Sequence, residues 1–600
     1  MRNTNCFYGK VLALVVFFSF LLSSFPARAQ NVVTSDDLSG GFIFRTSAKA
    51  VQKKVVQKIS STVKRVKAKV VDTTKRIRKQ TVTVAKTQPK RTKTKEVNPT
   101  VLVTDKTINR KPKDEVAKIF AGAGEYYLNN DEVDKAVDIF REATVLDEKN
   151  VTAKLGFSEA LTRKGDLHLE KEEFTTAKSY YLEALKFNDK NAGAYAGLGE
   201  VYELTNETDK AFENYKKALS LDADLTEIYT SLGILFYQKG EIAEADTYIT
   251  KALANSADNA ETQFFLGLVR FKQNKMSEAI AAFQKAVKID PNYSEAYYYL
   301  GESFDQSGKN DEAIAAYKEA VRINPKYTEA WFDLGVAYYN GEKYTEAIAA
   351  YKQTLVLKND FGEAYSNLGD VYRQTNKLDE AIGAYRLAVA FVKTDDELYT
   401  NYGLVAARLA LDPAKRGFWN TAIDNFKKAV ALKPDYINYS NLGWAYLNSG
   451  QSDAKFNNPT DSKAKLQEAK TTLLEAIKLN DKFAAPFLNL GMSYTDLGDY
   501  KSAIETLKRA NDLRKDWIPA LNELGIAYRN NNDFDNAANA FKRALEIDEN
   551  FPGAIYNLGE TEYQRKNINE AKKAYQKLLK LKLNNLALRL EVVTKGAVKK

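Results

Sequence analysis

The sequence predicts an all-α protein that is built as an array of helical hairpins. The segment Ser294–Tyr327 is 34 residues long, and its apolar spacing predicts two amphipathic helices joined by a short polar turn. Residues 328–361 repeat the same pattern. Self-similarity at a period of this size is typical of solenoids, in which each unit packs only against its neighbours.

We count thirteen such repeats, and residues are placed below by their position within a repeat. Position 8 is small, usually Gly, and Ala follows twelve residues later in the regular repeats. Gly inside a helix costs about 1 kcal/mol relative to Ala, so we expect close approach of the second helix, sealed by an aromatic ring such as Tyr317, to compensate. The repeats span 117–150, 151–191, 192–225, 226–259, 260–293, 294–327, 328–361, 362–395, 396–435, 436–483, 484–517, 518–551 and 552–585.

This pattern resembles the tetratricopeptide repeat (TPR) family. The residues that carry the resemblance are Trp331, Leu334, Gly335, Tyr338, Ala347 and Tyr351, with Ala320 and Pro325 from the preceding repeat. The resemblance implies an all-α, right-handed superhelical solenoid of about thirteen TPR helix-turn-helix repeats over residues 114–585. It also implies that the first helices line a concave groove.

Three repeats are longer than 34 residues. Repeat 2 has seven extra residues around GDLHLEKEEF, which is close to two helical turns and could lengthen a helix. Repeat 9 has seven in DPAKRGFWN and repeat 10 has fourteen in NSGQSDAKFNNPTDSK. Because these two carry Pro, Gly, Asn and Ser, we expect loops there. In the C-terminal segment 586–600, we expect Leu586–Val593 to form a capping helix over the last apolar face.

Residues 1–29 have the features of a secretory signal peptide. The apolar run Val11–Leu22 is followed by Ala27-Arg28-Ala29, which fits a cleavage site. The apolar stretch is shorter than the roughly 20 residues that span a membrane, which disfavours an uncleaved anchor. We therefore expect an exported protein, periplasmic or extracellular, with a membrane-anchored form less favoured.

Residues 30–113 form a basic, low-complexity arm whose composition predicts disorder. Between Arg45 and Lys113 there are 22 Lys and Arg against 3 acidic residues, whereas the chain from Asp114 onward has 63 basic and 73 acidic residues. Apolar residues spaced by three and four could form a basic amphipathic helix on an anionic membrane, and a solvated tether is the alternative. They are Val51, Val55, Ile59, Val63, Val66 and Val70. The arm could also bind the acidic body of its own chain.

Catalytic chemistry has little support in the sequence. Cys6 and His168 are the only Cys and His, which argues against Cys/His zinc sites, thiol catalysis and histidine acid–base chemistry. No phosphate-cradling glycine loop appears, because the glycines recur inside helices. We therefore expect no enzymatic activity, cofactor or metal, and no specific nucleic-acid partner.

Candidate binding residues come from the groove that the TPR resemblance implies, where positions 2, 5, 9 and 12 of the first helices face the concave side. Position 2 carries a run of Glu, which either favours the helix dipole or attracts a basic ligand. Aromatic residues at positions 5 and 12 either anchor a ligand or pack between repeats. The Glu series is Glu227, Glu261, Glu295, Glu329, Glu363 and Glu397, and the aromatic residues are Phe264, Phe271, Tyr298, Phe332 and Tyr339.

Asparagines at position 6 form a second candidate set: Asn367, Asn441, Asn489 and Asn557. They resemble the asparagines that some TPR superhelices use to hydrogen-bond the backbone of an extended peptide, since an amide offers both donor and acceptor. We expect an exported, non-enzymatic scaffold that binds protein or peptide segments in the groove. The alternative is a structural tether whose residues 45–113 bind an anionic membrane or cell-surface polymer.

Overall fold

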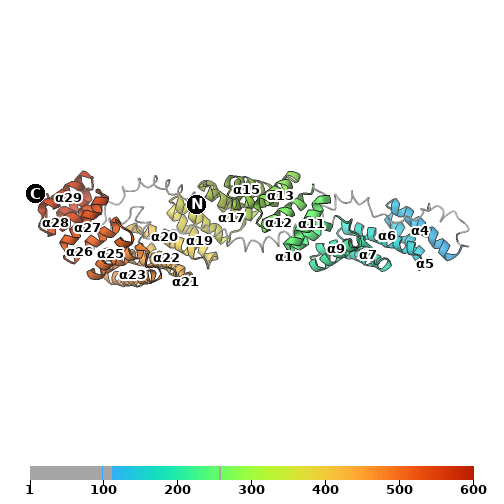
Figure 1. The fold of residues 1–600 in the computed structure, drawn as a ribbon, viewed down its shortest axis with the longest axis horizontal. Coiled ribbons are helices and arrows are strands. Elements are labelled where there is room, and N and C mark those ends of the chain that lie inside the picture. Colours follow the sequence, from blue (N-terminus) through green and yellow to red (C-terminus); the bar gives the residue numbers. More distant parts are fainter. Residues whose placement is uncertain (1–97, 99–107, 109–110, 227, 256–257, 600) are drawn as a thin grey trace. The chain divides into compact units, whose positions relative to one another are not determined.

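The computed structural model describes residues 98, 108, 111–226, 228–255 and 258–599, and across these ranges the chain is helical with no strand (Figure 1). The all-α prediction is confirmed. The predictions for residues 1–29, for the valine-rich stretch 51–70 and for Glu227 fall outside the described residues. In the part of the chain that is described, no helix combines the length and apolar character needed to cross a membrane.

Each repeat forms a pair of helices. The first helices are α4 (Lys113–Asn129), α6 (Val151–Glu170), α8 (Ala192–Leu204), α10 (Ile228–Lys239), α12 (Ala260–Lys272), α14 (Ser294–Gln306), α16 (Thr328–Asn340), α18 (Gly362–Gln374), α20 (Asp396–Ala410), α22 (Tyr436–Lys455), α24 (Ala484–Leu497), α26 (Ile518–Asn530) and α28 (Pro552–Gln564). The second helices are α5 (Val133–Leu146), α7 (Phe174–Phe187), α9 (Thr208–Leu221), α11 (Ile242–Asn255), α13 (Met276–Ile289), α15 (Asn310–Ile323), α17 (Tyr344–Leu357), α19 (Leu378–Phe391), α21 (Phe418–Leu432), α23 (Pro459–Leu479), α25 (Tyr500–Leu513), α27 (Phe534–Ile547) and α29 (Ile568–Lys580).

The described chain divides into two compact units, and the boundary between them in the sequence falls within repeat 7. The N-terminal unit contains α4 to α16 and ends at Lys343, and the C-terminal unit begins at Tyr344 and contains α17 to α30. Inside each unit, a second helix packs against its own first helix and against the first helix of the next repeat, and successive first helices also touch, as α4 and α6 do. Each unit is therefore a stack in which buried side chains pack between neighbouring helices.

A large buried side chain, in most repeats an aromatic ring at position 24, explains the glycines at position 8. A Cβ placed on Gly124 would lie 2.7 Å from the ring of Phe140, and one placed on Gly156 of the next repeat would lie 2.2 Å from the same ring. The ring is thus held between position 8 of its own repeat and position 6 of the following repeat. The close approach expected at position 8 is between a helix backbone and a buried ring, and this packing offsets the helical cost of Gly.

The long repeats follow the predictions in two cases and correct the third. In repeat 2 the insertion lengthens α6, as expected, and in repeat 9 it forms a loop with the short 3₁₀ helix η3 (Pro413–Lys415). The loop expected in repeat 10 is wrong, because its fourteen residues extend both α22 and α23. Seven residues added to each helix are close to two turns, so the packing face is kept. Gly450 accordingly packs on Leu466, as Gly443 packs on Leu473.

A final helix, α30 (Asn584–Val593), forms where the sequence predicts a cap. Its buried side chains Leu586 and Leu590 cover the last hairpin, and Leu590 lies directly over Gly559. The position-24 residue of the last repeat, Tyr575, has no following repeat to pack against. Helix α30 packs there in place of the first helix of a further repeat.

Candidate functional site

The aromatic residues expected at position 5 lie inside the stack. Phe264, Tyr298 and Phe332 are at most 4% exposed, which favours packing between repeats over the alternative of anchoring a ligand at the surface. Phe264 packs against the rings of Phe283 and Tyr299. Position 5 therefore belongs to the joint between repeats, because the next first helix covers it.

Tyr298 has a polar role in this joint. Its hydroxyl donates a 2.8 Å hydrogen bond to Oδ2 of Asp333 in the next repeat, and its ring packs against Tyr317 and Tyr327. Burial, followed by the charge of Asp333, raises the pKa of Tyr298 well above its ordinary value. The phenol therefore stays protonated and continues to donate to Asp333.

The position-12 rings Phe271 and Tyr339 are only partly buried and remain candidate anchors. Between their repeats lie Glu302 and Asp305, which are also partly exposed. The charge of Glu302 acts on residues of neighbouring repeats. Together with the larger effect of burial it raises the pKa of Tyr237, and it opposes the lowering of the pKa of Lys272 by burial. Side chains from repeats 4 to 6 thus converge on one face around Glu302.

Three positions of this face carry one sign of charge, whereas Lys272 stands at position 13 of repeat 5. At positions 2, 9 and 12 of repeats 3 to 7, every charged side chain is acidic. We call these positions the acidic face; its described carboxylates and partly exposed rings are Glu200, Glu203, Glu261, Glu295, Glu302, Asp305, Glu329, Phe271 and Tyr339. Such a surface attracts cationic groups, and the partly exposed rings offer apolar and cation–π contacts beside the carboxylates.

Glu203 is one of two buried carboxylates on the acidic face, the other being Glu261. Tyr215 donates a 2.7 Å hydrogen bond to Oε2 of Glu203, and the Glu203 side chain is 7% exposed. Burial raises the pKa of Glu203 to about 7, although hydrogen bonds from Tyr215 and Ser231 oppose the shift. Near neutral pH, this carboxyl group is therefore divided between its protonated and charged forms.

The position-6 asparagines do not lie on an open surface. Asn441, Asn489 and Asn557 are 0%, 4% and 2% exposed, and only Asn367 is partly exposed. The expectation that this set reaches a peptide backbone is corrected for the three buried members. Position 6 points at the position-24 ring of the preceding repeat, as Gly156 does in repeat 2.

The position-6 asparagines differ in their partners. Asn367 donates a 3.3 Å hydrogen bond to the hydroxyl of Tyr351, the position-24 residue before it. Asn441 and Asn489 follow Phe426 and Leu473, which have no hydroxyl group. Both amide atoms of Asn441 and the amide nitrogen of Asn489 have no hydrogen-bond partner within the protein. In contrast, Asn557 donates to Asn522 at 3.1 Å and accepts from Arg529 at 3.2 Å.

One further position-6 asparagine, Asn401, escaped the sequence reasoning because Tyr402 rather than Leu stands between it and Gly403. It is buried and donates a 3.1 Å hydrogen bond to Asp370, which also accepts a 2.6 Å bond from Tyr385. Burial raises the pKa of Asp370, and the nearby Arg373 opposes this shift. The position within the repeat, rather than the Asn-Leu-Gly motif, would have found this residue.

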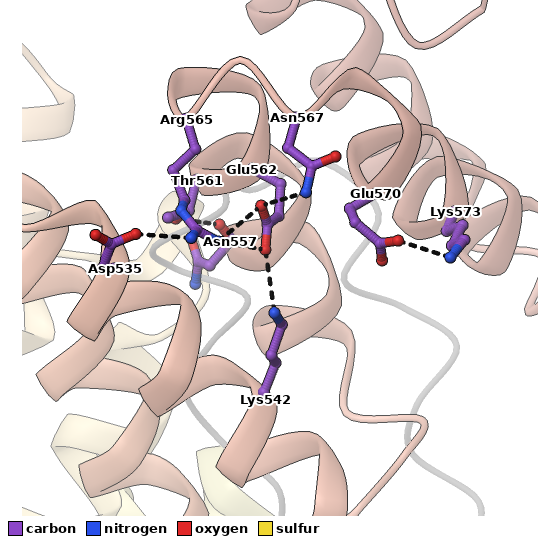
Figure 2. Close-up of polar contacts among 9 residues, drawn as sticks. All are labelled: Asp535, Lys542, Asn557, Thr561, Glu562, Arg565, Asn567, Glu570 and Lys573. Carbon is purple, nitrogen blue, oxygen red and sulfur yellow. Dashed lines mark hydrogen bonds and ion pairs between the residues drawn. The ribbon is translucent and has the colours of Figure 1, made fainter.

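A second polar cluster ties repeat 13 to repeat 12 (Figure 2). Glu562 is fully buried at position 11, where repeats 8 and 12 have Tyr. Its carboxylate accepts hydrogen bonds at 3.0 Å from Arg565 and 3.1 Å from Asn567, and it pairs with Lys542 of repeat 12 at 3.3 Å. Arg565 also pairs with Asp535 of repeat 12 at 2.7 Å. This cluster is a structural link between two repeats.

His168, the single histidine of the sequence, lies beside one carboxylate and one aromatic ring. Nδ1 of His168 lies 2.5 Å from Glu173, and its ring stacks on Tyr180 beside the turn of repeat 2. Among the described residues, no three His, Cys, Asp or Glu side chains come together as ligands of a metal ion. His168 therefore packs beside the end of the lengthened helix α6.

Comparisons with known families agree with the observed hairpins. Models described as TPR repeat match residues 204–240, 267–307 and 302–341, and models described as tetratricopeptide repeat match 158–191, 332–396, 484–516, 518–551 and 552–585. Together they cover about half of the chain. The chain belongs to the tetratricopeptide repeat family. The TPR hairpin is thus recognised in both units.

Solved structures of TPR proteins resemble parts of this TPR chain. The crystal structure of MamA protein is 30% identical over 28% of this chain and 90% of that chain, with a TM-score of 0.27. YrrB, described as a TPR protein with an unusual peptide-binding site, is 26% identical over 31% and 95%, with a TM-score of 0.28. The APC/C hetero-tetramer Cut9-Hcn1 is 17% identical over 77% and 99%, with a TM-score of 0.31. No curated protein sequence matches the chain.

Proposed function

We propose that this TPR protein is an exported, non-enzymatic scaffold that binds a protein segment along the acidic face of its N-terminal unit. The bound segment carries Lys or Arg together with an aromatic or large apolar residue. The observation that carries the proposal is that Phe271 and Tyr339 remain partly exposed on either side of Glu302 and Asp305. Export rests on the signal-peptide features of residues 1–29.

The chemistry of the acidic face suits such a segment. Carboxylates attract Lys and Arg over a distance and speed encounter, and a partly buried ring supplies an apolar anchor, which is the type of contact that dominates binding energy. Buried Phe264, Tyr298 and Phe332 support this surface from below, because they hold successive first helices in register. Position-12 side chains therefore bind, whereas position-5 side chains position the helices.

The test is a selection of displayed random peptides on the full mature chain. We expect selected peptides to be rich in Lys, Arg and aromatic residues, and to lose at least tenfold in affinity against the variant Phe271→Ala/Tyr339→Ala. The matched control, Phe391→Ala/Phe456→Ala, removes two exposed rings of the C-terminal unit and should leave affinity unchanged. Selected peptides that bind both variants equally well would contradict the proposal.

The tether remains a second candidate function, because the 22 Lys and Arg of residues 45–113 favour anionic surfaces. In this case the full mature chain would bind vesicles that contain phosphatidylserine and would not bind vesicles of neutral lipid. Binding should weaken as salt is raised, since surface electrostatics are screened. Equal binding to both kinds of vesicle would remove the electrostatic tether.

A further inference from the structure

We propose that the basic arm of this chain, residues 45–113, lies on the acidic face in cis and competes there with the external partner. This inference rests on the proposed function, because it names a regulator of the same surface. The occupant is a segment of the same chain, which adjoins the N-terminal unit at α4.

Charge complementarity is the first argument. The arm has 22 Lys and Arg against 3 acidic residues, while positions 2, 9 and 12 of repeats 3 to 7 carry acidic residues as their only charged side chains. The C-terminal unit does not offer the same surface. Its position-9 residues include Leu404, Trp444 and Ile526, which are buried, and Arg373 and Arg529 occupy position 12. An arm directed by charge therefore selects the N-terminal unit.

Chain length permits the contact. The arm is continuous with α4 of repeat 1, and the acidic face begins two repeats later in the same unit. The first helices of successive repeats pack side by side, about 10 Å apart. Six such steps place the first helix of repeat 7 about 60 Å from that of repeat 1. An extended chain covers about 3.3 Å per residue, so the roughly 65 residues before α4 reach this distance several times over.

Tethering makes a weak contact sufficient. A segment linked to its site has an effective concentration of the order of 1 mM, so a contact with a Kd of about 1 mM is half occupied in cis. The arm contains no Phe, Tyr or Trp between Arg45 and Lys113, and it therefore offers Phe271 and Tyr339 only cation–π contacts. A partner that has both cationic and aromatic side chains binds the same surface more tightly and displaces the arm.

The experiment measures energy transfer between two dyes in the full-length chain. In a Cys6→Ser background, Ser60→Cys carries one dye in the arm, and Asn340→Cys carries the other beside Tyr339, at the exposed end of α16. We expect efficient transfer at low salt that is independent of protein concentration. Transfer should fall at least twofold when about 0.5 M salt screens the charges.

Charge variants identify the surface. Glu302→Gln/Asp305→Asn/Glu329→Gln should lower the transfer at low salt by at least twofold. The matched control, Asp311→Asn/Glu312→Gln/Glu319→Gln, removes three carboxylates from the second helix α15 and should leave the transfer unchanged. Transfer that ignores salt, or that falls equally in both variants, would overturn the inference.

Competition separates this inference from the proposed function. A selected peptide that requires Phe271 and Tyr339 should lower the transfer as it binds. If such a peptide binds while the transfer is insensitive to charge and salt, the arm contact is wrong and the proposed function stands. If the arm responds as expected and no selected peptide depends on the two rings, the proposed function fails instead.

Discussion

Two buried carboxylates near the ends of first helices show how differently the two units treat a charge. Glu203 in α8 of the N-terminal unit accepts a hydrogen bond from Tyr215, and its pKa is raised to about 7 by burial. Glu562 in α28 of the C-terminal unit is paired with Arg565 and Lys542. Burial of Glu203 favours the protonated form of its carboxyl group, whereas the buried carboxylate of Glu562 is paired with cations.

The difference bears on function. A carboxyl group that can take up a proton needs no Lys or Arg beside it, so the acidic face can include a buried acid without losing its single sign of charge. In the C-terminal unit, two ion pairs cross the joint between repeats 12 and 13 (Figure 2). Arg565 pairs with Asp535, and Lys542 pairs with Glu562. Charges there hold the stack together, whereas the charged side chains at positions 2, 9 and 12 of repeats 3 to 7 are all acidic and attract cationic groups.

Removal of Glu562 should give the largest effect. Glu562→Ala deletes a buried carboxylate that accepts hydrogen bonds from Arg565 and Asn567 and pairs with Lys542. Hydrogen bonds to charged groups contribute about 1.5–3 kcal/mol each, so the total loss should exceed about 3 kcal/mol. The loss should appear as faster hydrogen exchange of the α27 and α28 amides.

The control for this variant is Glu570→Ala. Glu570 makes only a surface pair with Lys573 at 2.6 Å, and such exposed pairs contribute about 0–1 kcal/mol (Figure 2). If the two variants lose equal protection, the cluster around Glu562 does not link repeats 12 and 13.

Glu203→Gln should instead stabilise the N-terminal unit, and only at higher pH. The fold raises the pKa of Glu203 from 4.5 to about 7, so the folded state holds the proton more tightly and stability is lost as pH rises through this range. Gln removes that loss, with an expected gain of about 3 kcal/mol at pH 8 and little gain at pH 4.5. Urea unfolding at the two pH values measures it.

Glu207→Gln provides a control of opposite sign in the same repeat. The hydrogen bond with Lys210 lowers the pKa of Glu207, so its charged form adds stability that is lost as pH falls. The Gln variant should therefore lose stability at pH 8 relative to pH 4.5. If both variants were more stable than the parent protein at pH 8, burial of Glu203 would not be the cause of the stabilisation by Glu203→Gln.

The sequence predicted the hairpins well because their signals are local. The small residues at position 8 and the apolar spacing lie within one repeat, and Gly301 and Tyr317 meet as expected. It predicted the surface poorly, because exposure depends on the neighbouring repeat. Phe264 and Asn441 lie on the predicted helix face and are covered by the adjacent hairpin.

Length and composition of the insertions carried conflicting signals. The fourteen extra residues of repeat 10 are rich in Asn, Ser and Pro, which predicts a loop, yet seven residues on each of α22 and α23 keep both packing faces. Pro459 is tolerated because it stands in the first turn of α23, where Asn458 caps the helix. Packing between the two helices, which local propensity does not describe, decides this region.

The smallest expected effect extends the comparison from charged to neutral groups within the C-terminal unit. Asn441→Leu replaces a buried amide that has no partner, and leaving such a group unpaired costs about 1–3 kcal/mol, so the variant should be more stable by about that amount. Asn367→Leu removes an amide that already bonds to Tyr351 and should gain nothing. Urea unfolding of the full chain measures both.

Phe426→Tyr tests the same explanation without touching the amide. It adds a hydroxyl group at position 24 of the repeat before Asn441, which is where the hydroxyl of Tyr351 accepts a hydrogen bond from Asn367. A new hydrogen bond of this kind should stabilise the chain by about 1 kcal/mol. Asn441→Leu that destabilises the chain, together with Phe426→Tyr that has no effect, would mean that an ordered water already satisfies the amide. In that case the joint between repeats 9 and 10 would contain a polar cavity, and the contrast with the Tyr351–Asn367 joint would be one of hydration rather than of missing partners.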